Sequence, residues 1–131
     1  MDSFCLLIAH SENCRLLAEF LANHYRIIIQ APQDNLDLDE LFDLCIVDGL
    51  ALHQYKTQIQ RRVQQESPIF LPVLLVTHQQ YLQQTTGYLW EVVDDVLITP
   101  VNKRELLVRV GTLLRLRYYS LEKIQLIQRL Q

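Results

Sequence analysis

Residues 43–48 read DLCIVD, a short apolar run that begins and ends on an aspartate. A continuous apolar run between polar residues is typical of a β-strand buried on both faces, as in a parallel sheet. In the run 69–77 only the part after Pro72 is expected to pair, because proline cannot donate a hydrogen bond to a neighbouring strand. The other runs that predict strands are SFCLLIA (3–9), YRIIIQ (25–30) and DVLIT (95–99).

The segments between these runs carry apolar residues three and four residues apart, which is the spacing of an amphipathic helix. Ser67-Pro68 should end one of these helices, since a residue before proline avoids the helical conformation. The expected helices are residues 10–24 with Ser11 as a cap, 51–66, 78–93 with a possible break at Gly87, and 102 to the end with Asn102 as a cap, while 31–42 form a turn with at most a short helix.

Strand and helix alternate five times along the chain. This alternation predicts parallel strands joined by right-handed crossovers, with helices on both faces of an open α/β sheet. The functional site of such a sheet lies beyond the carboxyl ends of its strands. The residues expected at that edge are His10, Ser11, Asp48, Thr77 and Thr99, and His78 is a candidate to face His10 there.

The composition predicts one ordinary domain. The chain has 131 residues, half of them hydrophobic, and a net charge of −3, so it offers no basic surface for nucleic acid. Its three cysteines form no Cys-x-x-Cys motif, and no apolar run approaches the ~20 residues of a membrane span. We expect a reduced, cytoplasmic domain without a membrane segment, a signal peptide or a zinc site.

Several motifs together resemble the receiver domain of two-component response regulators. DLCIVD resembles the family's strand that ends in the phosphoacceptor, which falls on Asp48. PVLLVT resembles the strand that ends in a hydroxyl residue, which falls on Thr77, and DDVLITP resembles the family's Asp-Asp-Tyr-Leu-x-Lys-Pro. The resemblance covers about residues 3–118. It implies a flavodoxin-like, three-layer αβα fold with strand order 2-1-3-4-5, in a bacterial signalling protein.

The chain departs from the family at the residues that perform its chemistry. An acidic pair that holds a divalent metal in the family falls on His10 and Ser11, and the lysine before proline has become Thr99. Phosphoryl transfer depends on positioning and on electrostatic stabilisation, so these losses should make phosphorylation of Asp48 negligible. Asp48, Thr77 and Thr99 are then vestigial positions, and no catalytic residue, metal or cofactor is expected.

The resemblance and these departures together indicate a non-catalytic pseudo-receiver, not an enzyme. It would act through protein–protein interaction or dimerisation, with a histidine kinase or a C-terminal output domain among its partners. One alternative is a receiver that is phosphorylated on Asp48 with magnesium, in which Glu12 replaces a missing acid. Another is a regulatory domain that binds a small ligand, with His10, Asp48 and Thr77 lining the vestigial site.

The last helix is longer than a receiver requires. We expect residues 1–118 to form the receiver-like domain and residues 119–131 to be a helical extension continuous with its last helix. Such an extension reaches beyond the domain, and its apolar side chains need a partner. The stripe begins at Leu114, and the interface candidates are Tyr118, Leu121, Ile124, Ile127 and Leu130.

Cys5 and Cys45 lie on the first and third predicted strands, which are neighbours in the receiver order. They are either small residues of the core or, less simply, a pair close enough for a redox bridge.

Overall fold

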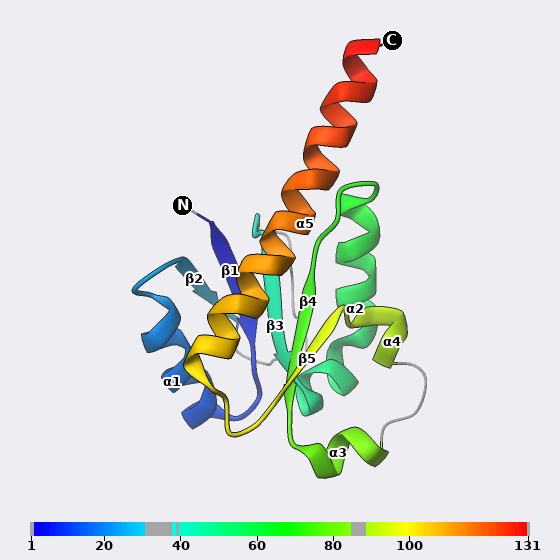
Figure 1. Ribbon diagram of the computed structural model, residues 1–131. Helices are drawn as coiled ribbons and strands as arrows, with labels where there is room; N and C mark the ends of the chain where they lie inside the picture. The colour runs from blue at the N-terminus through cyan, green and yellow to red at the C-terminus, as the bar shows by residue number, and fades with distance from the viewer. Residues whose placement is uncertain (1, 31–37, 39, 85–88, 131) are drawn as a thin grey trace.

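The computed structural model describes residues 2–30, 38, 40–84 and 89–130, and in this part of the chain five parallel strands form one sheet in the order β2-β1-β3-β4-β5 (Figure 1). The strands are β1 (Ser3–Leu7), β2 (Arg26–Ile29), β3 (Leu44–Asp48), β4 (Val73–Thr77) and β5 (Asp95–Ile98). Each lies inside a predicted run, and β4 begins directly after Pro72. The predicted sheet order is therefore confirmed.

Helices cover both faces of the sheet and complete three layers. The described helices are α1 (Ser11–Leu21), α2 (Gly49–Glu66), α3 (Gln79–Gln84), α4 (Leu89–Val92) and α5 (Lys103–Leu130). Side chains alternate along each strand, so successive residues face opposite layers. Cys45 and Val47 of β3 pack with Leu52 of α2, whereas Leu44 and Ile46 pack on the other face with α1 and α5. The α/β fold class is confirmed, and both faces of the sheet are core.

Two helix starts differ from the prediction. The N-cap of α1 is His10, whose ring nitrogen Nδ1 accepts a hydrogen bond from the backbone of Asn13 at 3.2 Å, so Ser11 is the first helical residue and not the cap. Helix α2 begins at Gly49, two residues earlier than expected, because Asp48 caps it. A carboxylate that accepts from a free amide of the first turn is a strong N-cap.

Other boundaries agree with the prediction or fall outside the described residues. Asn102 caps α5, since its Oδ1 accepts from the backbone of Glu105 at 3.0 Å. Helix α2 ends before Ser67-Pro68 as expected. The predicted helical stretch 78–93 contains α3 and α4, and the residues 85–88 between them, with Gly87, lie outside the described residues. The predicted turn 31–42 also lies mostly outside them.

Helix α5 has 28 residues and extends well beyond the sheet (Figure 1). Its buried residues end at Arg117, and none of its described residues after that point is buried. The helical prediction for the end of the chain is confirmed as far as Leu130. A division of the chain at residue 118 stays a prediction. None of the described helices is long and apolar enough to cross a membrane.

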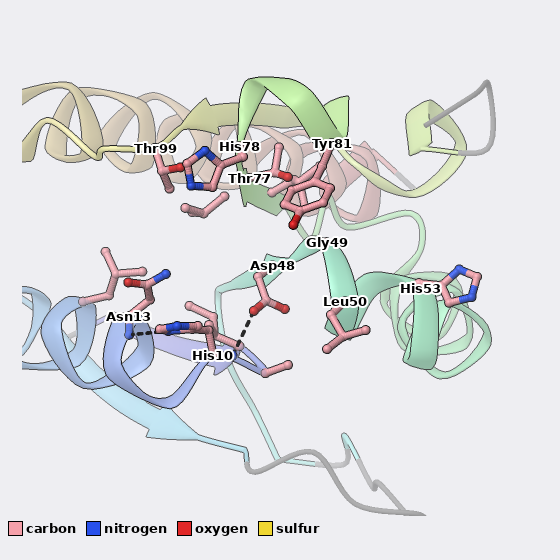
Figure 2. Close-up of a pocket in the computed structure, with 15 residues that line it drawn as sticks. His10, Asn13, Asp48, Gly49, Leu50, His53, Thr77, His78, Tyr81 and Thr99 are labelled. Carbon is pink, nitrogen blue, oxygen red and sulfur yellow. Dashed lines mark hydrogen bonds between the residues drawn. The ribbon is translucent and has the colours of Figure 1, made fainter. Parts of the chain in front are cut away.

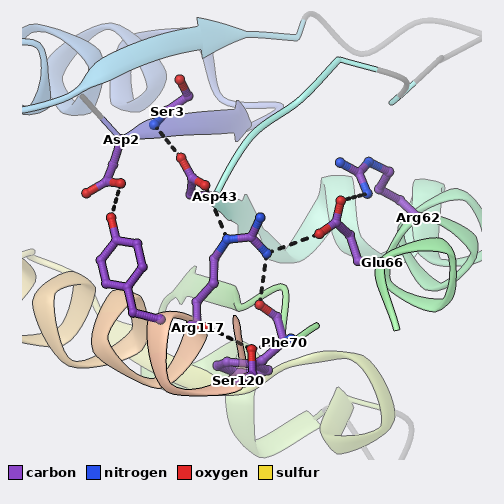
Figure 3. Close-up of polar contacts among 9 residues, drawn as sticks. Asp2, Ser3, Asp43, Arg62, Glu66, Phe70, Arg117 and Ser120 are labelled. Carbon is purple, nitrogen blue, oxygen red and sulfur yellow. Dashed lines mark hydrogen bonds and ion pairs between the residues drawn. The ribbon is translucent and has the colours of Figure 1, made fainter. Parts of the chain in front are cut away.

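A polar cluster holds α5 where it leaves the domain (Figure 3). Arg117 is only 8% exposed, and its guanidinium donates to Asp43 at 3.2 Å, to Glu66 at 3.2 Å and to the carbonyl of Phe70 at 3.0 Å. One turn later, the Ser120 hydroxyl accepts from the backbone of Phe70 at 3.0 Å. These contacts join α5 to β3, α2 and the loop before β4, at the sheet edge opposite the carboxyl ends of the strands.

Cys5 and Cys45 are register partners on the neighbouring strands β1 and β3, as predicted. Both are free thiols in the core, with exposed fractions of 1% and 2%. A hydrogen bond with Cys5, together with burial, raises the pKa of the Cys45 thiol. A buried thiol that stays protonated is a poor nucleophile, so the pair is a packing feature of the sheet.

Candidate functional site

Four of the five residues expected at the carboxyl edge of the sheet meet there. Asp48 and Thr77 are the last residues of β3 and β4, Thr99 directly follows β5, and His10 lies between β1 and α1. All four line one pocket of about 820 Å³ (Figure 2). The backbone of Thr99 donates to the carbonyl of Thr77 at 2.9 Å, which holds the two hydroxyl residues on adjacent chain segments.

The Asp48 carboxylate is held by the backbone on both of its oxygens. Oδ1 accepts from the amide of Ala51 at 2.9 Å, and Oδ2 accepts from the amide of His10 at 3.1 Å. The first bond caps α2, and the second ties the start of α1 to the end of β3. An ionised carboxylate accepts about four hydrogen bonds, so each oxygen keeps acceptor capacity on the pocket side.

His10 occupies an expected acidic position, but it is a helix cap. Its Nδ1 accepts from the amide of Asn13 at 3.2 Å, so the neutral ring carries its proton on Nε2. Ser11, in the other expected acidic position, is exposed as the first residue of α1 and does not line the pocket. The acidic pair of the family therefore has no counterpart at these two positions.

Glu12 does not take the place of a missing acid. Its carboxylate lies 2.5 Å from the Arg15 guanidinium on the exposed face of α1, and Glu12 does not line the pocket. The hydrogen bond and charge of Arg15 lower the pKa of Glu12. The alternative reading, in which Glu12 helps to hold a metal beside Asp48, has no support from this geometry.

The two hydroxyl residues differ in their surroundings. Thr77 is 8% exposed at the end of β4. The Thr99 hydroxyl oxygen is buried and, among the described residues, has no hydrogen-bond partner. Thr99 is the residue expected at the position of the family's lysine, and its side chain carries no charge. The next lysine in the chain, Lys103, lies 5.2 Å from the centre of the Phe20 ring and does not line the pocket.

The pocket also contains polar residues that the sequence reasoning did not assign to it. Asn13, His53 and Tyr81 line it from the N-terminal parts of α1, α2 and α3. The predicted His78, just before α3, also lines it, and its ring meets that of Tyr81 edge-on at 6.2 Å (Figure 2). Each of these residues follows the end of a strand by a few positions, and this position in the sequence is the only signal that could have assigned it to the pocket. Among the described residues that line the pocket there is no lysine or arginine, and Asp48 is its only carboxylate.

The donor atoms of this pocket do not fit magnesium. Magnesium needs oxygen ligands in an octahedral arrangement, usually from carboxylates and water. Asp48 is the one carboxylate among the described residues that line the pocket, so a single side chain would have to supply the charged ligands. Within the described part of the chain, no three His, Cys, Asp or Glu side chains are placed to hold a metal ion. We derive no chemical step that uses a metal here.

Comparison with solved structures identifies the fold. The chain matches a receiver-modulated diguanylate cyclase from Pelobacter carbinolicus with a TM-score of 0.66 and 23% identity, covering 92% of this chain and 98% of that one. It matches a CheY-like receiver domain protein from Methanospirillum hungatei JF-1 with a TM-score of 0.71 and 18% identity, covering 92% and 98%.

A third match is the receiver domain of a sensor histidine kinase from Pseudomonas aeruginosa PAO1, with a TM-score of 0.63 and 16% identity, covering 86% of this chain and 97% of that one. That structure holds a magnesium ion in its active-site cleft. No protein-family model and no curated protein matches the sequence. The chain therefore has the fold of response-regulator receiver domains.

Proposed function

We propose that this chain is a non-catalytic pseudo-receiver of a bacterial two-component-type regulator, and that it acts through protein contacts without phosphorylation of Asp48. The observation that carries the proposal is the state of Asp48. Its two carboxylate oxygens accept from Ala51 and His10, while the described residues around it include no lysine and no group of side chains placed to hold a metal ion. The residue serves as a helix cap in a receiver fold.

The charge that develops in phosphoryl transfer supports the same conclusion. A phosphoryl group in transfer spreads negative charge over its oxygens, and preorganised cations stabilise that charge. The loss of one such group from a site typically costs about 3 kcal/mol of transition-state stabilisation. Here His10, Ser11 and Thr99 replace all three expected groups. Their combined absence leaves Asp48 without the machinery for phosphoryl transfer.

The proposal is tested by intact-mass measurement after incubation with magnesium and acetyl phosphate. Wild type and Asp48→Asn should both keep their starting mass, because Asp48 is not modified. Asparagine is also a strong helix cap, so the variant should keep α2 in place. An ordinary receiver in the same tube must gain a phosphoryl group. A gain in wild type that Asp48→Asn lacks would refute the proposal and restore the phosphorylatable reading.

The exposed part of α5 is the best candidate surface for a partner. Of the predicted residues, Ile127 and Leu130 are 46% and 80% exposed, whereas Leu114, which begins the predicted stripe, is buried. Tyr118 is 40% exposed, but its hydroxyl donates to Asp2, and Leu121 and Ile124 are half-buried. The predicted stripe therefore runs partly along the face that points to the domain.

A different stripe lies on the outer face of α5. Leu116, Tyr119, Leu126 and Leu130 are 47%, 60%, 56% and 80% exposed, and with Lys123 they follow the alternating three- and four-residue spacing of a coiled-coil seam. We infer that the occupant of this seam is a second copy of the chain.

The charges that flank the seam favour an antiparallel pair of helices. Glu122 and Arg129 lie seven residues apart beside it, so two antiparallel copies place Glu122 of one helix near Arg129 of the other. In a parallel pair in register, Lys123 would face its own copy, and the like charges would repel.

Sedimentation equilibrium tests this part of the proposal. Wild type should dimerise with increasing concentration, and Leu126→Glu should shift the equilibrium to monomer. Gln125→Glu adds the same charge on a different side of the helix and should leave the dimer intact. The proposed dimer would be contradicted if wild type stays monomeric at every concentration. It would also be contradicted if Leu126→Glu and Gln125→Glu change the dimerisation equilibrium equally.

A further inference from the structure

The pocket beside Asp48 has the size of a small-molecule site. Its volume of about 820 Å³ falls in the upper part of the range of roughly 300–1,000 Å³ that is usual for ligand pockets. The wall behind Asp48 is apolar, since Ile8, Leu75 and Val76 are buried and line it. In a receiver this edge holds a metal and a phosphoryl group, for which the residues here are unsuited.

Two large side chains at the rim are exposed. Leu50 and Tyr81 line the pocket with exposed fractions of 66% and 60%, and they come from the starts of α2 and α3 (Figure 2). Figure 2 shows both near Asp48, which caps the helix that carries Leu50. An aliphatic and an aromatic side chain beside one carboxylate offer a contact surface for the apolar body of a ligand.

The polar groups inside the pocket define the charge of the ligand. Asp48 is the only carboxylate of the described lining, and no lysine or arginine is there to attract an anion. Each Asp48 oxygen accepts one backbone amide and keeps capacity for another donor. The Thr99 hydroxyl oxygen is buried, so Asp48 is the group that fixes the charge of the ligand.

We propose that this pocket binds a small organic amine, whose apolar body packs between Leu50 and Tyr81 and whose ammonium group donates to Asp48. The proposal rests on the proposed function, since it needs an Asp48 carboxylate that carries no phosphoryl group. The ammonium group of such a ligand would neutralise the negative charge of Asp48, as the lysine expected at position 99 would in a receiver. Binding would bridge the starts of α2 and α3, and so link occupancy of the pocket to the position of two helices.

The test is a titration of the full chain with three probes of matched shape, followed by amide nuclear magnetic resonance. The probes are phenethylamine, 2-phenylethanol and 3-phenylpropionate, which carry a positive charge, no charge and a negative charge. The amides of His10 and Ala51 are direct reporters, because both donate to Asp48. Phenethylamine should shift these two resonances in a saturable way and bind about tenfold more tightly than the alcohol. The carboxylate should bind most weakly.

Two variants separate charge recognition from apolar contact. Asp48→Asn keeps a helix cap but removes the charge, so it should weaken phenethylamine by about tenfold and leave the alcohol unchanged. Leu50→Ala alters an exposed side chain, so the fold should persist while both probes bind more weakly. Equal binding of amine and carboxylate, no effect of Asp48→Asn on the amine, or no saturable shift by the amine would overturn the proposal. Mass measurement with acetyl phosphate reports separately on phosphorylation, so failure of amine binding alone leaves the proposed function standing.

Discussion

Replacement of Arg117 by alanine should be among the most destabilising changes in α5. The side chain of Arg117 is 10% exposed and lies between Asp43 and Glu66, at 3.2 Å from each carboxylate. It also donates to the carbonyl of Phe70 at 3.0 Å. Arg117→Ala removes all three contacts at once and leaves two carboxylates near each other without their shared cation.

The expected loss follows from what the two carboxylates retain. Removal of one partner from a buried ion pair costs about 3–5 kcal/mol. Glu66 keeps Arg62 at 3.0 Å, and Asp43 keeps the amide of Ser3 at 2.9 Å, so the lower end of that range applies. We expect the free energy of unfolding to fall by about 3 kcal/mol, which lowers the melting temperature by about 10 °C for a domain of this size.

Urea unfolding followed by circular dichroism measures this loss, with Arg115→Ala as the matched control. Arg115 is an exposed arginine on the same helix, and it makes one hydrogen bond of 3.3 Å to Thr112. Its replacement should change the free energy of unfolding by less than about 0.5 kcal/mol. A loss below about 1 kcal/mol for Arg117→Ala, or equal losses for the two variants, would refute the role assigned to the cluster.

Three further changes have definite expected outcomes. Gly111→Ala should raise the free energy of unfolding by about 1 kcal/mol in the same urea assay, because an added Cβ meets nothing within 4 Å in the middle of α5; a loss of stability would contradict this. His10→Ala should cost about 1 kcal/mol by loss of the α1 cap, whereas His10→Asn keeps a capping side chain and should cost less; equal costs would exclude the cap. Burial and the hydrogen bond to Asp2 raise the pKa of Tyr118 from 10.0 to about 12. The protonated Tyr118 side chain therefore stabilises the fold fully below pH 10, and this contribution is lost as the pH rises through about 12. Absorbance titration of wild type should show a tyrosine that titrates near pH 12 and that Tyr118→Phe lacks, and the same titration curve at high pH in both proteins would contradict this assignment.

The central strands β1, β3 and β4 could be predicted from the sequence because they are buried on both faces. The interiors of these three strands are apolar, and a continuous apolar run of this length is typical of a strand in a parallel sheet. The start of α2 was placed two residues late because Asp48 serves as both the last strand residue and the helix cap. A pattern of apolar spacing cannot reveal a cap that also belongs to a strand.

The pocket was predicted only in part, since its remaining members depend on long-range packing. His10, Asp48, Thr77 and Thr99 follow from their position at strand ends. The residues that line the pocket from the helices could not be assigned to it from the sequence. The packing of each helix on the sheet decides which of its side chains face the pocket. The same limit explains the stripe on α5, where Leu114 is apolar but buried against the sheet.

Magnesium binding at the carboxyl edge of the sheet tests most directly whether the phosphoryl-transfer centre is absent. The measurement is a magnesium titration of wild type, followed by the amide resonances of His10, Asp48 and Thr77, with an ordinary receiver titrated in parallel. Wild type should show no saturable shift, because Asp48 is the only carboxylate among the described residues that line its pocket. The ordinary receiver should show one. Saturable binding by wild type at these residues would contradict the account and return Asp48 to the chemistry of ordinary receivers.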